Sequence, residues 1–147
     1  MMHIGLALFL AASLLAPFGG TAHRKTEEGN RHLAEESYDE ALAAYTEAQV
    51  HAPDAPQLYY DVGNVLYRQG DFEGAAEASK RALLEGPADL APLAAYNLGN
   101  ARFQQKEYQD AVDAYRRALE AQPGDRDAKR NLELALEALK KQQEQQQ

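Results

Sequence analysis

The stretch GNVLYRQGDFEGAAEASKRALLEGP, residues 63–87, decides the fold because its small residues recur elsewhere in the chain at fixed spacing. It opens with Gly63-Asn64 and continues through Ala75 and Ala82 to Pro87. The same residues occur at all five of these positions 34 residues earlier and 36 residues later. The matching positions are Gly29, Asn30, Ala41, Ala48 and Pro53, then Gly99, Asn100, Ala111, Ala118 and Pro123. Three copies of one short unit therefore make up most of the chain.

Each unit has the pattern of two helices joined by a tight turn. In the second unit the pattern predicts helices over about 57–69 and 72–85. Gly70 tolerates the left-handed conformation that ends the first helix, and Asp71 can cap the second. The other two units have Glu36-Ser37 and Lys106-Glu107 at the same places, where the missing glycine should cost up to about 1 kcal/mol. Ser37, followed by a glutamate three residues later, matches a capping box.

Small residues should let the two helices of a unit approach closely. We expect Gly63 to meet Ala75 and Gly99 to meet Ala111 where the helices cross. Aromatic and leucine side chains at helical spacing should fill the remaining core. One core position differs between units, being Tyr45, Ser79 and Tyr115 in turn. The serine predicts looser packing in the middle unit.

A last helix should cover the end of the stack. Leu132, Leu136 and Leu139 recur at i, i+4 and i+7, so we expect this stripe to face the third unit. The predicted capping helix spans about residues 126–141, and a polar, Gln-rich tail follows over residues 142–147. The expected product is all-α, with seven helices.

The period, the small residues and the closing proline resemble those of the tetratricopeptide repeat (TPR) family over roughly residues 22–141. The resemblance implies an α-solenoid of three helix-turn-helix repeats, followed by the capping helix. The implied repeats span about residues 22–55, 56–89 and 92–125, within a domain of residues 23–141. It also implies a protein that binds other proteins and is not an enzyme.

Composition agrees with a binding module. The 147 residues carry a formal net charge of −8, which opposes binding to nucleic acid because phosphates require a basic surface. The chain has no cysteine, hence no disulfide and no thiolate metal site. It has four scattered histidines and no phosphate-binding loop, so we expect no catalytic residues, no metal and no cofactor.

The N-terminus has the pattern of an export signal. An apolar run from Ile4 to Phe18 is followed by Gly20-Thr21-Ala22, which matches a signal-peptidase site. We interpret residues 1–22 as a signal peptide, although the segment before the run has no Lys or Arg. A short, uncleaved signal-anchor followed by Arg24 and Lys25 is the alternative. Either interpretation predicts an extracytoplasmic or membrane-anchored protein.

The resemblance places the binding surface on the first helices of the repeats. By repeat register the candidate groove residues are Thr26, Asn30, Leu33, Tyr60, Asn64, Tyr67, Tyr96, Asn100, Phe103, Arg130 and Leu134. The three asparagines would form a ladder that bonds both N–H and C=O groups of an extended peptide. The alternative is that asparagine after glycine is a general TPR feature without a binding role.

One TPR subtype can be tested by its residues. TPR domains that clamp a C-terminal carboxylate use Lys and Asn on the first helix of repeat one, Asn on that of repeat two, and Lys and Arg on that of repeat three. The five positions here are Thr26, Asn30, Asp61, Leu93 and Asn97. Only Asn30 fits, so we expect a neutral or basic, partly apolar ligand.

The C-terminal end is similar to a particular group of TPR proteins. The run NLELA at residues 131–135 and the Gln-rich tail resemble the TPR proteins of bacterial aerotolerance (Bat) operons. That resemblance implies an envelope adaptor that works with von Willebrand A (VWA) domain membrane proteins. Two alternatives stay open: a holdase-like accessory chaperone, and a self-assembling scaffold whose oligomers depend on residues 140–147.

Overall fold

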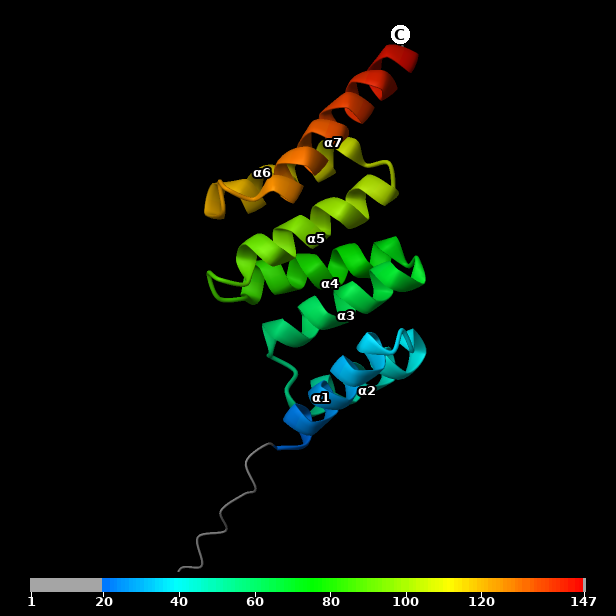
Figure 1. The fold of residues 1–147 in the computed structure, drawn as a ribbon, viewed down its shortest axis with the longest axis vertical. Helices are drawn as coiled ribbons and strands as arrows, with labels where there is room; N and C mark the ends of the chain where they lie inside the picture. Colours follow the sequence, from blue (N-terminus) through cyan, green and yellow to red (C-terminus); the bar gives the residue numbers. More distant parts are fainter. Residues whose placement is uncertain (1–19, 147) are drawn as a thin grey trace, which may run out of the picture.

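The computed structural model describes residues 20–146, and this part of the chain folds into seven helices without a strand (Figure 1). The helices are α1 (Thr21–Ala34), α2 (Tyr38–His51), α3 (Pro56–Gln69), α4 (Phe72–Glu85), α5 (Ala91–Gln104), α6 (Tyr108–Ala121) and α7 (Arg126–Gln145). The predicted all-α architecture, three helix pairs and a capping helix, is confirmed. Most of the predicted signal segment, residues 1–19, lies outside the described residues. None of the seven helices is both long and apolar enough to cross a membrane.

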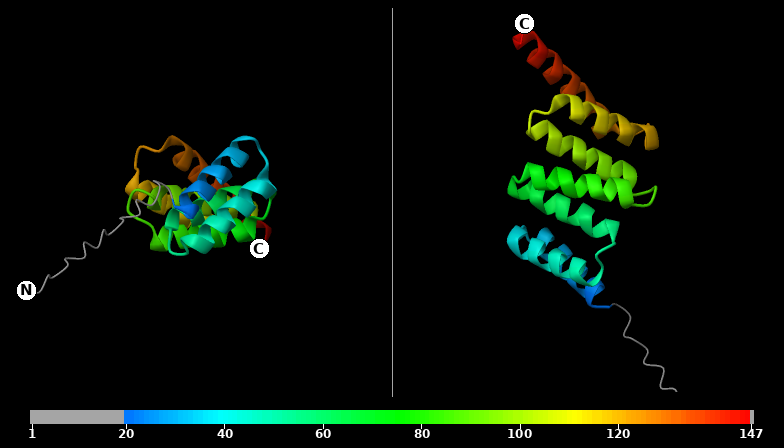
Figure 2. Two further views of the ribbon diagram at one scale, coloured as in Figure 1. Left: turned by 90° about the horizontal axis from the view of Figure 1, so that it is seen from below. Right: turned by 180° about the vertical axis from the view of Figure 1, so that it is seen from behind.

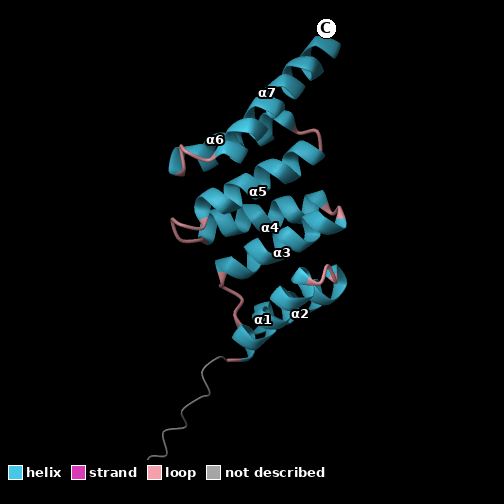
Figure 3. Cartoon of the chain, in the orientation of Figure 1, coloured by secondary structure: helices cyan, strands magenta, loops and turns pink. Residues whose placement is uncertain are grey.

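The pairs stack in a single row. Repeat one (α1 and α2) lies at one end, repeats two (α3 and α4) and three (α5 and α6) follow, and α7 lies at the other end (Figure 2). Short loops join the helices (Figure 3). Besides its partner within the repeat, α5 also contacts α3 and α7. Helices α3, α5 and α7 therefore run side by side and build one continuous surface.

In every repeat, a residue in the left-handed backbone conformation follows the first helix. Gly70 has φ 84°, and Glu36 and Lys106 adopt φ 57° and 63° at the equivalent places. In each turn the next residue donates its backbone N–H to a carbonyl five residues earlier, as Asp71 does to Leu66 at 2.9 Å. Two repeats thus form this turn with a side chain where glycine is favoured.

The two predicted helix caps differ in outcome. An Asp71 side-chain oxygen accepts the Gly74 N–H at 2.9 Å, as expected. Ser37 has nearly the same backbone angles, but its hydroxyl makes no capping bond, so the predicted capping box is wrong. The carboxylate of Asp reaches one bond further from the backbone than the hydroxyl of Ser.

Gly63 and Gly99 each lie closer to another residue than to the predicted alanine, although the carbonyl oxygen of Ala75 would still lie 3.4 Å from a Cβ atom on Gly63. A Cβ atom on Gly99 would lie 2.6 Å from the ring of Tyr115, and one on Gly29 would lie 2.6 Å from the ring of Tyr45. On Gly63 the nearest atom would be the Ser79 hydroxyl oxygen, at 3.0 Å. The close approach is therefore to the residue four positions after each alanine, one helical turn further on.

The capping helix contacts repeat three through two of the three predicted leucines, with Ala135 in place of Leu136. Leu132, Ala135 and Leu139 pack against the buried cluster of α6, while Leu136 is 40% exposed. The helix also continues to Gln145 and extends past the stack (Figure 1), so part of the predicted tail is helical. Gln142 donates a hydrogen bond to the carbonyl of Lys106 at 3.2 Å, which ties this extension to repeat three.

Candidate protein-binding groove

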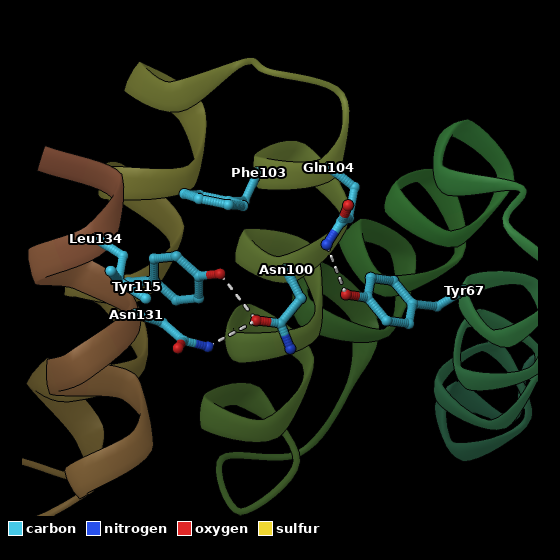
Figure 4. Close-up of a pocket in the computed structure, with 7 residues that line it drawn as sticks. All are labelled: Tyr67, Asn100, Phe103, Gln104, Tyr115, Asn131 and Leu134. Atoms are coloured by element: carbon cyan, nitrogen blue, oxygen red, sulfur yellow. Dashed lines mark hydrogen bonds between the residues drawn. The ribbon is translucent and has the colours of Figure 1, made fainter. Parts of the chain in front are cut away.

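Two adjacent pockets lie on the surface formed by α3, α5 and α7. The first, which we name the Phe103 pocket, has a volume of about 160 Å³ (Figure 4). Its lining residues are Tyr67, Asn100, Phe103, Gln104, Tyr115, Asn131 and Leu134. The second, the Gly63 pocket, has a volume of about 170 Å³. Its lining residues are Gly63, Asn64, Tyr67, Arg68, Asn97 and Asn100. Because Tyr67 and Asn100 belong to both, the two pockets form one groove.

A hydrogen-bond network fixes the wall of the Phe103 pocket. Oδ1 of Asn100 accepts the Tyr115 hydroxyl at 2.8 Å and Nδ2 of Asn131 at 3.0 Å (Figure 4). Nδ2 of Asn131 also donates to the hydroxyl oxygen of Tyr96 at 3.0 Å. The network joins α5, α6 and α7, so the polar groups of this wall are held in place before any ligand binds.

Apolar surface lies beside this network. Phe103 packs edge to face against Tyr108, with 5.4 Å between the ring centroids. Leu134 comes from α7 and is 46% exposed. Across the pocket, Nε2 of Gln104 donates to the Tyr67 hydroxyl at 3.3 Å (Figure 4). The pocket therefore combines an apolar contact with amide and phenol groups, the composition typical of sites that bind peptide side chains.

The three repeated asparagines are engaged within the fold. The Tyr45 hydroxyl donates to Oδ1 of Asn30 at 2.8 Å, as Tyr115 does to Asn100. Oδ1 of Asn64 accepts Nδ2 of Asn97 at 2.6 Å. Each amide oxygen thus already has an internal donor, and the oxygen of Asn100 has two. Nδ2 of Asn64 and Nδ2 of Asn100 have no acceptor among residues 20–146, so the groove mainly offers N–H donors.

Two acidic side chains, Asp61 and Glu27, lie near Tyr45 and outside the two pockets. Burial raises the pKa of Asp61 from the ordinary 3.8 to about 6, and the Gln57 amide, 3.1 Å from its carboxylate, partly opposes this rise. Burial, and then the charges of Asp61 and Glu27, raise the pKa of Tyr45 to about 12. Burial likewise raises the pKa of Tyr115. Both tyrosines therefore stay neutral hydrogen-bond donors at physiological pH.

The candidate residues separate into two groups. Asn64, Tyr67, Asn100, Phe103 and Leu134 line the two pockets. The others lie elsewhere on the described surface or in its packing: Thr26, Asn30, Leu33, Tyr60, Tyr96 and Arg130.

Several candidates outside the pockets have identifiable roles. The Thr26 hydroxyl donates to the carbonyl of Ala22 in its own helix at 2.9 Å. Leu33 and Tyr60 pack against buried clusters. Tyr96 orients Asn131, and Arg130 is exposed on α7.

Several lining residues are not among the groove residues predicted from the sequence. These are Gly63, Arg68, Asn97, Gln104, Tyr115 and Asn131. A signal existed for two of them: Asn97 and Asn131 lie 34 residues apart, so the repeat register extended into α7 would have aligned them. Within residues 20–146 no group of three or more acidic or histidine side chains is placed to hold a metal ion.

Residues 26–89 and 67–126 match the family model described as tetratricopeptide repeat. The chain belongs to the tetratricopeptide repeat family. Solved TPR domains have the same fold, although no curated protein matches the sequence significantly. The first TPR domain of human RPAP3 has a TM-score of 0.78 at 26% identity, over 84% of this chain and 96% of that chain. The Sgt2 TPR domain from Aspergillus fumigatus has a TM-score of 0.76 at 28% identity, over 84% and 82% of the two chains.

A third TPR structure contains a ligand. The first TPR of Spaghetti (RPAP3), bound to the HSP90 peptide SRMEEVD, has a TM-score of 0.77 at 27% identity. The match covers 81% of this chain and 93% of that chain. The domain therefore aligns with a peptide-binding TPR domain over nearly its whole length.

Proposed function

We propose that this TPR protein is an adaptor that holds a segment of another protein in the groove formed by the Phe103 and Gly63 pockets. The observation that supports it is the continuity of the groove, in which Tyr67 and Asn100 belong to both pockets. Amide N–H donors along the groove suit the carbonyls of an extended chain, and Phe103 with Leu134 suits an apolar side chain.

The ligand differs in chemistry from the peptide in the Spaghetti structure, whose sequence ends in Glu-Glu-Val-Asp. Of the five carboxylate-clamp positions, none carries a cation here, and Asp61 is itself acidic. A carboxylate placed there would meet a partly buried carboxyl group without a positive partner. The proposed ligand is therefore an internal segment, neutral or basic near Asp61 and apolar near Phe103.

We further propose that the protein works in the bacterial envelope, with a VWA-domain membrane protein as its partner. The apolar run in residues 1–22 supports an extracytoplasmic or anchored location. The NLELA run and Gln-rich tail, which resemble those of Bat-operon TPR proteins, support the partner. Both proposals are independent of the groove, because they rest on the two ends of the chain.

Site-specific photo-crosslinking of the full chain tests the groove and the partner together. A photoreactive amino acid at Phe103 should crosslink to the VWA-domain protein encoded nearby. The matched control is Val50, which is 74% exposed on α2 and lies outside both pockets. Equal crosslinking from both positions would contradict groove binding. Crosslinking of many unrelated exported proteins from Phe103 alone would indicate the holdase alternative.

A further inference from the structure

Repeat two lacks a contact that the other two repeats share. In repeat three, the ring of Tyr115 lies against Gly99 and its hydroxyl bonds to the adjacent Asn100. Tyr45, Gly29 and Asn30 form the same arrangement in repeat one. Repeat two retains the glycine and the asparagine, but its third residue is Ser79, whose side chain has no ring to reach across.

The two pockets of the groove are equivalent positions in successive repeats. Tyr67, Asn64 and Asn97 in the Gly63 pocket correspond to Phe103, Asn100 and Asn131 in the Phe103 pocket. The difference lies in the floor. Tyr115 lines the Phe103 pocket, whereas backbone Gly63 lines the Gly63 pocket, because Ser79 is too short to cover it.

Because repeat two lacks this tyrosine, the amide oxygen of Asn64 also has one hydrogen-bond donor fewer than that of Asn100. Oδ1 of Asn100 accepts two donors, the Tyr115 hydroxyl and Nδ2 of Asn131. Oδ1 of Asn64 accepts only Nδ2 of Asn97 among residues 20–146. A carbonyl oxygen has two lone pairs, so Asn64, which lines the pocket, keeps one unused acceptor site. Beneath the pocket floor, the Ser79 hydroxyl is 1% exposed and has no hydrogen-bond partner in the described part of the chain.

We propose that the Gly63 pocket receives a tyrosine side chain from the bound segment. The inference rests on the proposed groove function and names one side chain of its ligand. The ring of this tyrosine lies over Gly63, and its hydroxyl donates to Oδ1 of Asn64. The partner thus supplies a phenol where repeats one and three use their own tyrosines.

Tyrosine fits this pocket better than other donors. A glycine floor without Cβ leaves room for an aromatic ring, as Gly29 and Gly99 do within the fold. A lysine or arginine would supply a donor but would meet the like charge of Arg68, which lines the pocket. A phenylalanine would fill the space and leave the open acceptor of Asn64 without a donor.

Selection of peptides tests the proposal without knowledge of the natural partner. A random dodecapeptide display library is selected on the full-length wild-type chain and, separately, on Ser79→Tyr. Wild-type selection should enrich tyrosine at one position. Changing that tyrosine to Phe should weaken binding about 2- to 10-fold, and changing it to Ala about 10-fold or more. Ser79→Tyr should weaken the same peptides to the level of the Ala peptide, while Ser79→Ala, which leaves the pocket open, should change their affinity less than twofold.

A second measurement applies if Ser79→Tyr does not fold, as judged by circular dichroism. In a double-mutant cycle, Asn64→Ala on the protein and Tyr→Phe on the peptide should not be additive, because both remove the same hydrogen bond. Additive effects would overturn the proposed hydrogen bond between the tyrosine hydroxyl of the peptide and Oδ1 of Asn64. Groove-binding peptides without an enriched tyrosine would overturn the tyrosine proposal and leave the groove function standing. A library that yields no groove-binding peptide would overturn both.

Discussion

The hydroxyl of Tyr115 donates to Oδ1 of Asn100 across 2.8 Å, and this bond links the helix core of repeat three to the wall of the groove. The ring of the same tyrosine fills the space beside Gly99, so one side chain both packs the repeat and positions a groove residue. Substitutions at this contact should therefore change stability and groove geometry together, whereas substitutions on the outer surface should not.

Tyr115→Phe should destabilise the protein by about 1 kcal/mol, because Asn100 loses one of its two donors while the ring stays in place. Urea unfolding followed by circular dichroism measures this free energy. Tyr108→Phe is the matched control, since Tyr108 is only half-buried and its hydroxyl has no partner among residues 20–146. If Tyr108→Phe lowers the unfolding free energy as much as Tyr115→Phe does, the hydrogen bond from Tyr115 to Asn100 is contradicted.

Alanine substitutions at two equivalent glycines should have different outcomes. In Gly99→Ala the new Cβ would lie 2.6 Å from the Tyr115 ring, which its hydroxyl bond holds in place. Overpacking should outweigh the higher helix propensity of alanine and cost about 1–2 kcal/mol net. In Gly63→Ala the nearest atom is the Ser79 hydroxyl oxygen at 3.0 Å, which can rotate away.

Gly63→Ala should therefore be neutral or stabilising by up to about 1 kcal/mol. Thermal and urea unfolding of both variants provide the comparison. The explanation fails if the two substitutions shift stability equally, since that would mean that the ring at position 115 does not set the cost.

The repeat pattern was sufficient to predict the architecture. Small residues recurring with the closing proline fixed the number of helix pairs, and Gly70 located a turn that the other repeats also form. Several pocket residues, such as Tyr67, Asn100 and Phe103, followed from the register alone. Periodicity can predict these features because equivalent residues occupy equivalent places in a stack of repeats.

Periodicity could not predict how side chains pair. Asn30, Asn64 and Asn100 occupy one register position, yet only Asn30 and Asn100 accept a tyrosine hydroxyl from their own repeat, because repeat two has Ser79 at the tyrosine position. Leu136 belongs to a valid i, i+4 stripe, but Ala135 is the residue that faces repeat three. The first outcome depends on a residue that breaks the repeat, and the second depends on how α7 is rotated against repeat three, which spacing within one helix does not determine.

Lys106→Gly should stabilise the protein by about 0.5–1 kcal/mol. Lys106 has φ 63°, a left-handed conformation that costs a side-chain-bearing residue free energy and costs glycine almost none. The gain is partly offset by the greater freedom of glycine in the unfolded chain. Gly70→Ala, at φ 84°, is the reciprocal control and should destabilise by about 1 kcal/mol. Urea midpoints for the two variants should move in opposite directions; a shift in the same direction would argue against strain at these turns.

Asp61→Asn should change how stability depends on pH. The folded pKa of Asp61, about 6, lies above the ordinary value of 3.8, so the folded state binds the proton more tightly than the unfolded state. The stabilisation from protonated Asp61 is fully present below about pH 4 and is lost as the pH rises through about 6. The Asn variant lacks this loss. Between pH 4 and pH 8 the wild type should therefore lose about 1–2 kcal/mol more unfolding free energy than the Asn variant, allowing for solvent screening. Parallel stability curves for the two proteins between pH 4 and 8 would show that Asp61 titrates normally.

Leucine-to-alanine substitutions on α7 test whether Leu136, unlike Leu132, lies outside the contact with repeat three. Leu132 packs against the buried cluster that contains Ala111 and Tyr115, so Leu132→Ala should leave a cavity and cost about 2 kcal/mol. Leu136 is 40% exposed, so Leu136→Ala removes less buried surface and should cost about 0.5 kcal/mol or less. Helix propensity favours both changes to a similar small extent, which makes the pair a matched comparison.

Because α7 also supplies Asn131, loosening the cap should release the Asn100 amide from one donor. Amide hydrogen exchange should therefore increase in α7 of Leu132→Ala before it increases in α3. If Leu136→Ala proves the more costly substitution, α7 is rotated by about one residue from the position described.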